Sequence, residues 1–483
     1  MTKKKCVSTC KQFEEPECNP PRCKYVKGQS RKYCRLSHNY KMNKTNCNVT
    51  RRIKKRDVAA VAKKRIGRLV KTSKHFLSIV CPNSGVCTAF GKNTDELTQF
   101  FKGFTNFNYA VSPVRRIGAV SNNGFVNEIE YEKQGYKAHA ILKSSQNAEA
   151  DNLVYEYLVG IKYINRKIKA FPCFVQTHGL YFYDSPENWK IFKDNKHLEK
   201  SQLKHLILQN NIEYVKACKE STYASLLIQH IQNAKSIEDM IKQSEFIRKD
   251  LLHVLFIVYH ALSSLSKTFT HYDLHIGNVL LYKPSTGKYI QYHYHHSDGT
   301  ETTFFSPYIP KIIDYGRSFF DNGNVKSKNI YDKICSIKGC KPHCGTDYGF
   351  AWLDPEPYLT ISSSKKNESH DLRLLNMLKK NILHVPDTES HIELDEIFKH
   401  IVYGMGISKR DDKEYGTTED LTISKTKIYN VKGAYASLKK AVENPEVVKE
   451  NLMNFSSLQK IGDLHVYHNE EPMKYEEFKP NKV

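Results

Sequence analysis

Long hydrophobic runs are missing from this sequence of 483 residues. No apolar stretch approaches the roughly 20 residues that a membrane-spanning helix requires. The lysine-rich start of the chain is not followed by the apolar segment of a secretory signal. We therefore expect a soluble, unsecreted, intracellular protein without membrane insertion, located in the cytoplasm or the nucleus.

Acidic residues are scarce at the start of the chain. Residues 1–75 contain 23 Lys and Arg against 4 Asp and Glu, whereas the remaining residues contain 51 against 47. Such a basic arm is suited to nucleic acid, to an acidic protein surface or to nuclear import. Its densest part, residues 51–65, would form a helix with apolar residues along one face, and a solvated tail is the alternative. Binding to a phosphate backbone would be salt-sensitive.

The same arm is rich in cysteine, with six of the chain's 13 cysteines in the first 47 residues. Its prolines indicate a loop-rich segment that is too small for its own core. Cys18, Cys23, Cys34 and His38 offer four ligands for Zn²⁺. Free thiols and disulfides are the alternatives, and a reducing compartment favours thiols over disulfides.

The most informative segment is residues 271–281, which read His-Tyr-Asp-Leu-His-Ile-Gly-Asn-Val-Leu-Leu. A second carboxylate, Asp314, follows in Asp-Tyr-Gly. Phosphoryl transfer needs a carboxylate that orients and deprotonates the attacking hydroxyl, and further oxygens that hold Mg²⁺ on the nucleotide phosphates. Asp273 suits the first role, and Asn278 and Asp314 suit the second. An ordinary polar loop is the alternative.

The residues around these groups predict a regular order of elements. Apolar residues from Leu251 to Leu265 recur every three or four positions, which predicts a helix with one buried face. Residues 279–282 and 311–313 read as buried strands, and the second would deliver Asp314. Gly316 would supply the backbone freedom that a turn bearing a carboxylate often needs.

These motifs resemble those of the protein kinase superfamily. Residues 271–281 are similar to its catalytic loop, and Asp314-Tyr315-Gly316 is similar to its magnesium-binding Asp-Phe-Gly. Residues 140–143, Ala-Ile-Leu-Lys, resemble the Val-Ala-Ile-Lys strand, whose lysine contacts the α- and β-phosphates of ATP. Lys143 is the residue that the resemblance selects, and Ile141 would lie against the nucleotide. A snorkelling surface lysine is the alternative.

The resemblance also implies partners for Lys143. Residues 148–164 read as a helix, in which Glu156 would form an ion pair with Lys143; Glu149 is the alternative. Gly118, Val120, Gly124 and Val126 are similar to the glycine-rich loop over the phosphates, although its two glycines stand one residue farther apart than in the family pattern. A plain β-turn at residues 122–124 would look similar.

The hinge between the two lobes is expected at residues 229–231. By the resemblance, the backbone of Gln229 and Ile231 would bind adenine. A capped helix start follows at Ser236. The similarity covers roughly residues 111–460 and implies an α+β, bilobal fold. We expect a Cys-rich arm in residues 1–50, a basic helix and linker in 51–110, a β-rich N-lobe in 111–232 and a helical C-lobe in 233–483.

Several residues depart from the common kinase pattern. Tyr272 replaces the arginine that usually pairs with a phosphorylated activation loop, and His275 stands where a lysine near the γ-phosphate is common. The Asp-Leu-His-x-Gly-Asn form and the long insertion from Tyr282 to Pro310 are most similar to haspin-like kinases. Kinases encoded by large DNA viruses share similar features, which would place the protein in a virion if the chain is viral.

The segment after Asp314 lacks a clean Ala-Pro-Glu, and residues 354–357 stand in its place. Asp371 resembles the aspartate that opens the central helix of the large lobe and holds the catalytic-loop backbone; a carboxylate at a helix N-terminus is the alternative. Cys335, Cys340, His343 and Cys344 lack the usual two-residue ligand spacing, so free thiols are favoured over zinc there.

Together these features predict a serine/threonine protein kinase that uses ATP and Mg²⁺ and acts on a protein substrate. Two other classes stay open. A small-molecule kinase of the aminoglycoside or choline kinase type would share the loop through His275. A pseudokinase scaffold would use the basic arm to bind nucleic acid or a partner, and would need no chemistry.

Overall fold

The computed structural model describes residues 23–27, 32–36, 91, 93–118, 120, 124–146, 153–212, 221–231, 233–335, 351–352, 359–360, 363–364, 366–382, 392–403 and 427–477. The chain divides into two compact units, residues 1–68 and 69–483. The finer division into four parts stays a prediction. Within the described ranges, no helix is long and apolar enough to cross a membrane.

The first unit contains one described hairpin. Strands β1 (Cys23–Lys27) and β2 (Lys32–Leu36) pair antiparallel, with Tyr25 opposite Cys34. Cys18, His38 and the predicted basic helix in residues 51–65 lie outside the described residues. The zinc hypothesis for this arm therefore stays a prediction.

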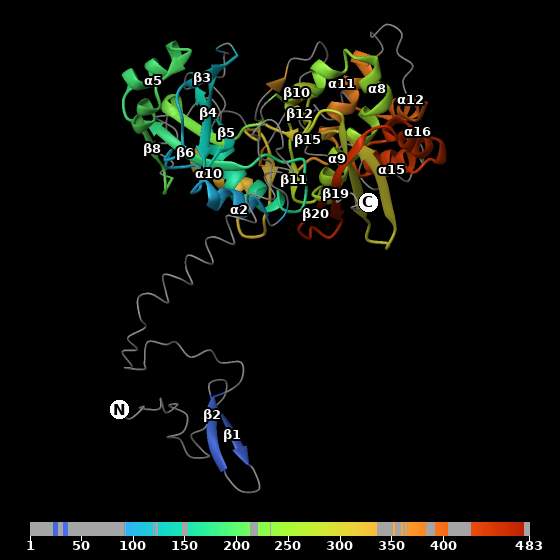
Figure 1. Ribbon diagram of the computed structural model, residues 1–483, viewed down its shortest axis with the longest axis horizontal. Helices are drawn as coiled ribbons and strands as arrows, with labels where there is room; N and C mark the ends of the chain where they lie inside the picture. The colour runs from blue at the N-terminus through green and yellow to red at the C-terminus, as the bar shows by residue number, and fades with distance from the viewer. Residues whose placement is uncertain are drawn as a thin grey trace. The chain divides into compact units, whose positions relative to one another are not determined.

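The second unit begins with a seven-stranded sheet in the order β7-β3-β4-β5-β9-β6-β8, in which all neighbours are antiparallel (Figure 1). Gln134 and Gly135 join β4 to β5 with φ values of 53° and 80°, as a two-residue hairpin turn requires. The strands are β3 (Val114–Ile117), β4 (Gly124–Lys133), β5 (Tyr136–Ser145), β6 (Thr177–Tyr183), β7 (His197–Leu198), β8 (Leu206–Leu208) and β9 (Ala224–Gln229).

Helix α3 (Leu153–Val159) packs on β6 and β9 and continues as a π-helical turn, Gly160–Ile164, and α4 (Asn165–Lys167). A Cβ at Gly160 would lie 2.1 Å from Thr177 Oγ1, so only glycine allows this close approach to β6. The sequence predicted a helix over residues 148–164, of which the structure describes the part from Leu153 onward. The sheet is also accompanied by α2 (Asn93–Phe100) and α5 (Pro186–Asp194).

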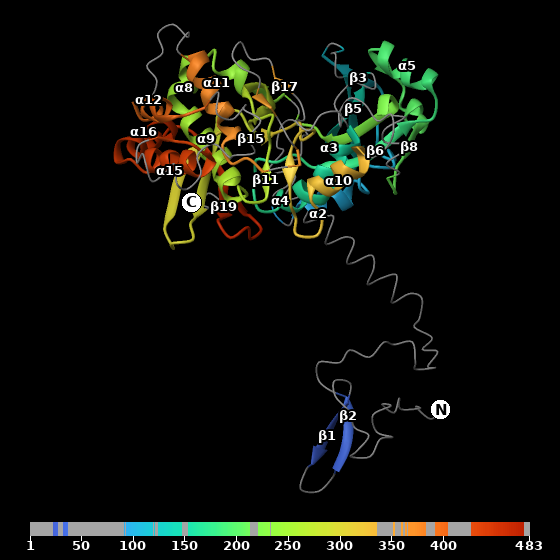
Figure 2. The ribbon, with the colours of Figure 1, turned by 180° about the vertical axis from the view of Figure 1, so that it is seen from behind.

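A buried helix, α9 (Leu251–Ser264), forms the centre of the following part (Figure 2). Its residues from Leu251 to Leu262 are all buried, so the expectation of a single buried face was wrong. The helix is enclosed because α8 (Ser244–Lys249), α15 (Val431–Val442), β14 (Glu301–Ser306) and β15 (Ile309–Ile312) all pack on it. A helix that is apolar all round is typical of such a position.

A three-stranded antiparallel sheet, β10-β12-β15, adjoins the segments that carry Asp273, Asn278 and Asp314. Strand β12 (Val279–Tyr282) follows Asn278 directly, and β15 (Ile309–Ile312) ends two residues before Asp314. Ser236, at the end of β10 (Lys235–Ser236), accepts a hydrogen bond from the Asp239 N–H and caps α7 (Ile237–Met240), as predicted.

A four-stranded sheet, β14-β13-β19-β20, contacts α9 through its edge strand β14. The predicted insertion forms the hairpin β13 (Lys288–His295) and β14 (Glu301–Ser306), and β19 (Gln459–Tyr467) joins it in parallel from the end of the chain. Further elements of the second unit are α10 (Ser327–Cys335), α11 (Arg373–Ile382), α12 (Ile392–His400), α16 (Pro445–Phe455) and β20 (Lys474–Glu477).

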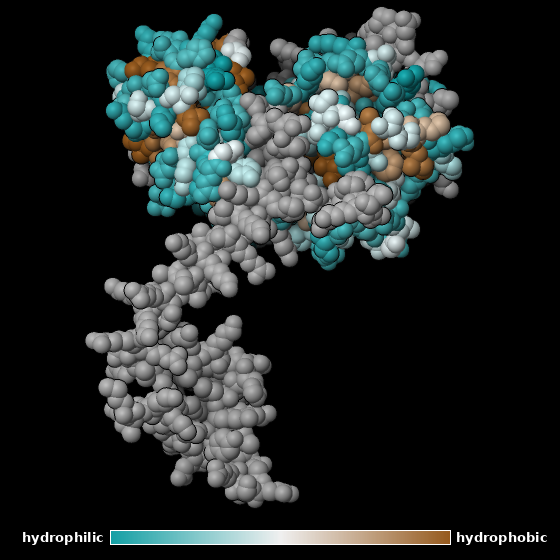
Figure 3. Space-filling view, viewed as in Figure 1, coloured by the Kyte–Doolittle hydropathy of each residue, from teal (hydrophilic) through white to brown (hydrophobic). Residues whose placement is uncertain are grey.

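The second unit is thus a mixed α+β structure, with an antiparallel sheet in its N-terminal part and helices after it, which is compatible with a kinase-like bilobal fold. The face in Figure 3 is mainly hydrophilic, with small, separate hydrophobic areas over both parts.

Candidate active site

Lys143 lies between two carboxylates. Its Nζ is 2.9 Å from Glu156 Oε2 and 2.9 Å from Asp314 Oδ1. Strand β5 supplies the lysine, α3 supplies Glu156, and the turn after β15 supplies Asp314. The Glu156 side chain is only 2% exposed, and a carboxylate so deeply buried needs a cationic partner. The structure therefore brings together three residues that the sequence selected; the alternative, Glu149, lies outside the described residues.

The turn that carries Asp314 has an unusual backbone. Asp314 adopts a φ of 68°, in the left-handed region that aspartate tolerates better than most residues. We expected Gly316 to provide the conformational freedom of this turn, and the residue that the structure shows in the left-handed region is Asp314. Tyr315 anchors the turn, because its hydroxyl donates to the Ile312 carbonyl at 2.6 Å and accepts from the Val175 N–H at 3.0 Å.

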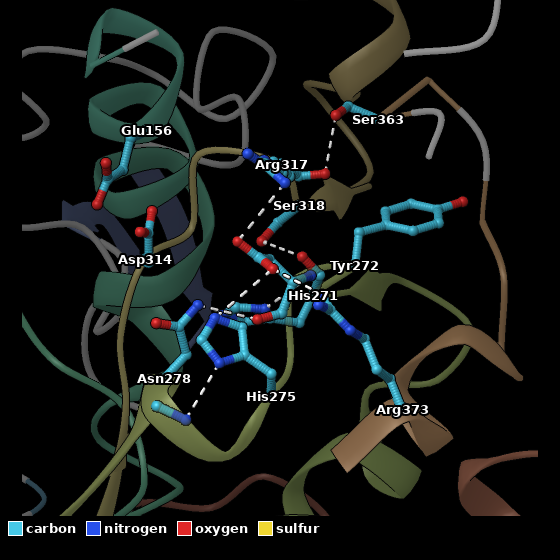
Figure 4. A network of polar contacts seen from close by, with 12 residues as sticks. Glu156, His271, Tyr272, His275, Asn278, Asp314, Arg317, Ser318, Ser363 and Arg373 are labelled. Atoms are coloured by element: carbon cyan, nitrogen blue, oxygen red, sulfur yellow. Dashed lines mark hydrogen bonds and ion pairs between the residues drawn. The ribbon is translucent and has the colours of Figure 1, made fainter. Parts of the chain in front are cut away.

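Asp273 is buried in the loop of residues 271–278, beside two guanidinium groups. Figure 4 labels the two arginines that carry them, Arg317 and Arg373. Arg373 Nη1 donates to Asp273 Oδ1 at 2.8 Å, and Arg317 Nη1 lies 3.8 Å from Oδ2. Burial raises the pKa of Asp273 to about 6, against the lowering effect of the two arginines. The carboxylate is thus a base of moderate strength, which suits proton transfer near neutral pH.

Asp371 holds the backbone of this loop through two hydrogen bonds. Its two oxygens accept hydrogen bonds from the N–H groups of His271, at 2.8 Å, and Tyr272, at 2.9 Å. The carboxylate is buried at the start of a short 3₁₀ turn, His370–Leu372, that leads into α11. This geometry matches the anchoring role that the resemblance implied for Asp371. Tyr272 has a φ of 65°, and its ring packs edge-on against His370.

Two histidines of the loop are neutral and shape its backbone. His271 Nδ1 accepts from the Asp273 N–H at 3.2 Å, and this pattern assigns the proton to Nε2, which lies 3.0 Å from the Ile313 carbonyl. His275 Nδ1 accepts from the Gly277 N–H at 3.1 Å. Burial is the largest cause that lowers the pKa of each imidazole to about 4. His275 therefore brings no positive charge to the site at neutral pH.

Asn278 and Asp314 offer oxygen atoms on one side of the site. The Asn278 amide donates from Nδ2 to the Asp273 carbonyl at 2.9 Å, which fixes the side chain and leaves Oδ1 as the free end of the amide. In Figure 4, Asn278 lies below Asp314. Burial would raise the pKa of Asp314, but Lys143 and Arg317 hold it below its ordinary value, so the group is a carboxylate.

Those two side chains fit Mg²⁺. Magnesium usually takes one or two protein oxygens and completes its shell with water and phosphate. Among the described residues, no cluster of three or more His, Cys, Asp or Glu could hold a metal by itself. The amide of Asn278 and the carboxylate of Asp314 match the one or two protein oxygen ligands that a magnesium–nucleotide complex needs.

The positions predicted for the glycine-rich loop lie at the end of β3, after it, and at the start of β4. Val126 stands opposite Lys143 in the β4–β5 pair, and Gly124 stands opposite Ser145. A Cβ at Gly124 would come within 2.1 Å of the Ser144 carbonyl, so the position needs glycine. Gly118 has a φ of 67° and leaves β3 in a left-handed turn. Val120 is exposed, and residues 121–123 lie outside the described residues.

The predicted adenine-binding segment lies at the end of β9. The Gln229 N–H donates to the Gln176 carbonyl at 2.8 Å, and the His230 N–H donates to the His139 carbonyl at 3.1 Å. Ile231 is buried. Ile141 precedes Lys143 by two residues, so the two side chains lie on the same face of β5. The nucleotide contacts of Gln229, Ile231 and Ile141 stay a prediction.

Sequence reasoning did not single out Arg317 or Arg373. Arg317 follows the Asp-Tyr-Gly motif by one residue, and Arg373 follows Asp371 by two, so their nearness to recognised motifs was the available signal. Residues 354–357 and Cys340, His343 and Cys344 lie outside the described residues, and nothing tests the hypotheses about them.

No protein-family model matches the chain, and no curated protein matches it. Among solved structures, the chain is similar to the crystal structure of a kinase domain, at 14% sequence identity and a TM-score of 0.28. The similarity covers 73% of this chain and 85% of that chain. So distant a likeness carries no argument about function, which has to come from the site itself.

Proposed function

We propose that the protein is an ATP-dependent protein kinase that transfers the γ-phosphoryl group to serine or threonine hydroxyls of a protein substrate. The observation that carries the proposal is the contact of Lys143 with both Glu156 and Asp314 at 2.9 Å, next to the loop that holds Asp273 and Asn278. Burying charged groups costs free energy of desolvation. A scaffold without catalytic activity would have no need for the buried Lys143–Glu156 pair or for the three oxygen-bearing side chains near it.

The residues divide the reaction among them. Lys143, held by Glu156, binds the α- and β-phosphates. Asp273 orients the acceptor hydroxyl and takes its proton while the new O–P bond forms. The bond from the γ-phosphorus to the β-phosphate oxygen breaks, and that oxygen leaves with the electron pair as part of ADP. Holding the reactants in line contributes most of the rate, because little covalent chemistry is left to the protein.

Asn278 and Asp314 would hold Mg²⁺. When bound, the ion neutralises charge on the β- and γ-phosphate oxygens. Asp314 also keeps Lys143 in place, since one of its oxygens accepts from the ammonium. Arg373 is a positioning residue in this scheme, because its hydrogen bond fixes the orientation of Asp273.

A transfer experiment with several classes of acceptor tests this proposal. The full chain is incubated with Mg²⁺ and ATP labelled in the γ-phosphate, together with basic proteins, acidic proteins, an aminoglycoside and choline. We expect label in protein as phosphoserine or phosphothreonine, and none after Asp273→Ala. Label only in a small molecule would overturn the protein kinase assignment. A parent chain that is folded but gives no thermal shift with ATP and Mg²⁺ would favour the scaffold.

The basic arm is proposed to bring the kinase to its target. Residues 1–75 carry the charge excess noted above, and nucleic acid or an acidic protein would complement it. Zn²⁺ bound by Cys18, Cys23, Cys34 and His38 would fold part of this arm, and metal analysis of the full chain, compared with Cys23→Ser, tests that idea.

A further inference from the structure

Strand β5 carries more than Lys143 on the face that the proposed function assigns to the nucleotide. Side chains alternate along a strand, so His139, Ile141 and Lys143 share one face of β5. Residues that stand directly opposite one another in an antiparallel pair also share a face. Val126 of β4 stands opposite Lys143, and Glu128 stands opposite Ile141. These five side chains therefore lie on the same side of the sheet.

The middle of this face is apolar. Ile117 of β3 stands opposite Val126, and Ile228 of β9 stands opposite Ile141. Ile117 is 38% exposed, and Val126 and Ile141 are half-buried. Ligand pockets typically combine a mainly apolar lining with a few placed polar groups. A flat purine ring suits such a surface, and polar groups at the edge of the surface would decide which purine is bound.

A polar cluster of Glu128, His139 and His230 lies at the end of this face that is remote from Lys143. Glu128 Oε1 is 2.9 Å from His139 Nδ1 and 3.4 Å from His230 Nδ1. The side chains of Glu128, His139 and His230 are 12%, 2% and 17% exposed. At about 3.3 Å per residue, His139 stands roughly 13 Å from Lys143 along β5. A nucleotide whose phosphates lie at Lys143 therefore extends its other end toward the polar cluster.

The polar cluster presents hydrogen-bond acceptors. The pKa of Glu128 is lowered, chiefly by its contact with His139, so the group is a carboxylate. Burial lowers the pKa of His230 to about 4, so its ring is neutral at neutral pH. Because Nδ1 of His230 faces the carboxylate, the single proton of the ring belongs on Nδ1, and Nε2 is an acceptor. Oε1 of Glu128 is buried between both imidazoles, so Oε2 is the oxygen that would accept from a ligand.

Two backbone donors at the end of β9 are already used within the protein. The Gln229 N–H donates to the Gln176 carbonyl at 2.8 Å, and the His230 N–H donates to the His139 carbonyl at 3.1 Å. Neither donor is available to read a base while these hydrogen bonds persist. Side chains of the polar cluster would therefore take a share in base recognition.

We propose that Glu128 and His230 select the base of the nucleotide by accepting hydrogen bonds from the 6-amino group of adenine. This inference rests on the proposed function, which places the phosphates at Lys143. The ribose lies between the phosphates and the base, so the part of ATP that reaches the polar cluster is the base. The amine offers two N–H donors, and Glu128 Oε2 and His230 Nε2 are two acceptors.

Guanine would be rejected for two reasons. It carries an acceptor oxygen at position 6, which the carboxylate of Glu128 repels. Its N1–H and 2-amino donors lie side by side and are best bound by both oxygens of one carboxylate, but the two imidazoles engage Oε1. A site built to accept from an amine discriminates against analogues that lack it, because its polar groups are then left without a partner.

Binding of Mg²⁺ complexes of ATP, purine riboside triphosphate and GTP to the full chain, measured by calorimetry, tests the inference. Purine riboside triphosphate lacks only the 6-amino group. The parent should bind ATP at least about tenfold more tightly than this analogue, and GTP more weakly still. Glu128→Leu should bind ATP and the analogue with equal affinity. Because the ratio is measured on one protein, a general loss of stability does not change it.

Two further variants and one further nucleotide complete the test. His230→Leu should lower the ratio of the two affinities at least about threefold, because one of the two acceptors is lost. Glu130→Gln is the matched control, since Glu130 lies on the same face of β4 and pairs with Lys137 at 2.6 Å; it should keep the parental ratio. The parent and Glu128→Leu should bind 2′-deoxy-ATP as they bind ATP.

Three results would overturn the inference. The first is equal affinity of the parent for ATP and purine riboside triphosphate. The second is a parental ratio in Glu128→Leu, or in His230→Leu if Glu128→Leu does not fold. The third is a preference of the parent for ATP over 2′-deoxy-ATP that Glu128→Leu abolishes, which would assign the polar cluster to the ribose. If the parent transfers phosphate from ATP, these results reject the base-reading role alone. A parent that binds no nucleotide rejects the proposed function as well.

Discussion

The carboxylate of Asp371 accepts the backbone N–H of His271 at 2.8 Å, and its second oxygen accepts the next N–H in the chain. This contact joins the 3₁₀ turn before α11 to the loop that carries Asp273. It orients the loop because both amides are buried and cannot form hydrogen bonds with solvent instead. The position of Asp273, two residues later, depends on it.

Asp371→Ala should therefore destabilise the protein strongly. Two buried N–H groups would lose their acceptor, at a cost of about 2 to 5 kcal/mol in the free energy of unfolding. Denaturation in urea measures this change. Asp332→Ala removes an exposed carboxylate from α10 and should change the free energy of unfolding by less than about 0.5 kcal/mol. Similar values for the two variants would show that Asp371 is not an anchor.

The Lys143–Glu156 pair predicts a coupling between two substitutions. Lys143→Met would leave Glu156 in a buried position without its cation, which costs about 3 to 5 kcal/mol. Adding Glu156→Gln removes the stranded charge, so the double variant should be more stable than Lys143→Met alone. Urea unfolding of the four proteins in this cycle gives the coupling energy. Both variants that carry Lys143→Met should lose ATP affinity; purely additive stabilities would contradict the ion pair.

The pKa of Asp273 predicts how activity depends on pH. The proposed base would work only when deprotonated, and its pKa of about 6 means that kcat should fall as the pH drops through 6. Arg373 lowers this pKa, so Arg373→Met should move the acid limb to higher pH, whereas Arg373→Lys should move it less. A pH profile of kcat distinguishes this positioning role from a general loss of stability. An acid limb at the same pH in all three proteins would contradict it.

A buried neutral histidine predicts a loss of stability in acid. Burial lowers the pKa of His370 to about 3, far below the value of about 6.5 in an unfolded chain. Below pH 6.5 the unfolded state binds more protons, so stability is lost as the pH falls through this range. At pH 5, His370 alone would contribute a loss of about 2 kcal/mol.

His370→Phe tests this directly. The variant should lose stability less steeply between pH 7 and pH 5, as measured by urea denaturation at several pH values. His197→Gln changes an exposed histidine of β7 and should keep the parental slope. Equal slopes for the parent and His370→Phe would mean that His370 does not titrate in this way.

Deletion of residues 1–75 should separate binding from catalysis. The shortened chain should keep its affinity for ATP, because the residues proposed to hold the nucleotide all lie after residue 110. It should bind duplex DNA or an acidic protein more weakly, and the difference should shrink as salt is raised. Fluorescence anisotropy at low and at high salt measures the affinity for the partner and the dependence of that affinity on salt. Partner affinity that stays the same at every salt concentration would remove the basis for a role of the arm.

The site residues that could be predicted from the sequence are those that belong to short sequence motifs. Asp273 and Asn278 share one short loop, Lys143 ends an alternating strand segment, and Glu156 stands among apolar residues where an unpaired carboxylate is costly. Each of these signals comes from residues within a few positions of one another. The strands β5 and β12 were predicted for the same reason.

The parts that the sequence did not predict depend on distant contacts. Arg373 is 100 residues from Asp273 in the chain, and no local pattern joins them. Strand β19 pairs with β13 although 170 residues separate the paired region in the chain, and Gly160, the first residue of the π-helical turn after α3, lies close to Thr177 of β6. α9 was expected to have an exposed face because its cover comes from later elements such as α15.

The central claim is that Asp273 is the base of a magnesium-dependent phosphoryl-transfer site. The most direct measurement is single-turnover transfer of labelled γ-phosphate by the parent and by Asp273→Asn, with ATP affinity determined on the same preparations. We predict unchanged ATP affinity and a transfer rate at least about 10²-fold lower in the variant. Equal rates in the two proteins, or a parent that is folded, binds ATP and transfers nothing, would contradict the claim.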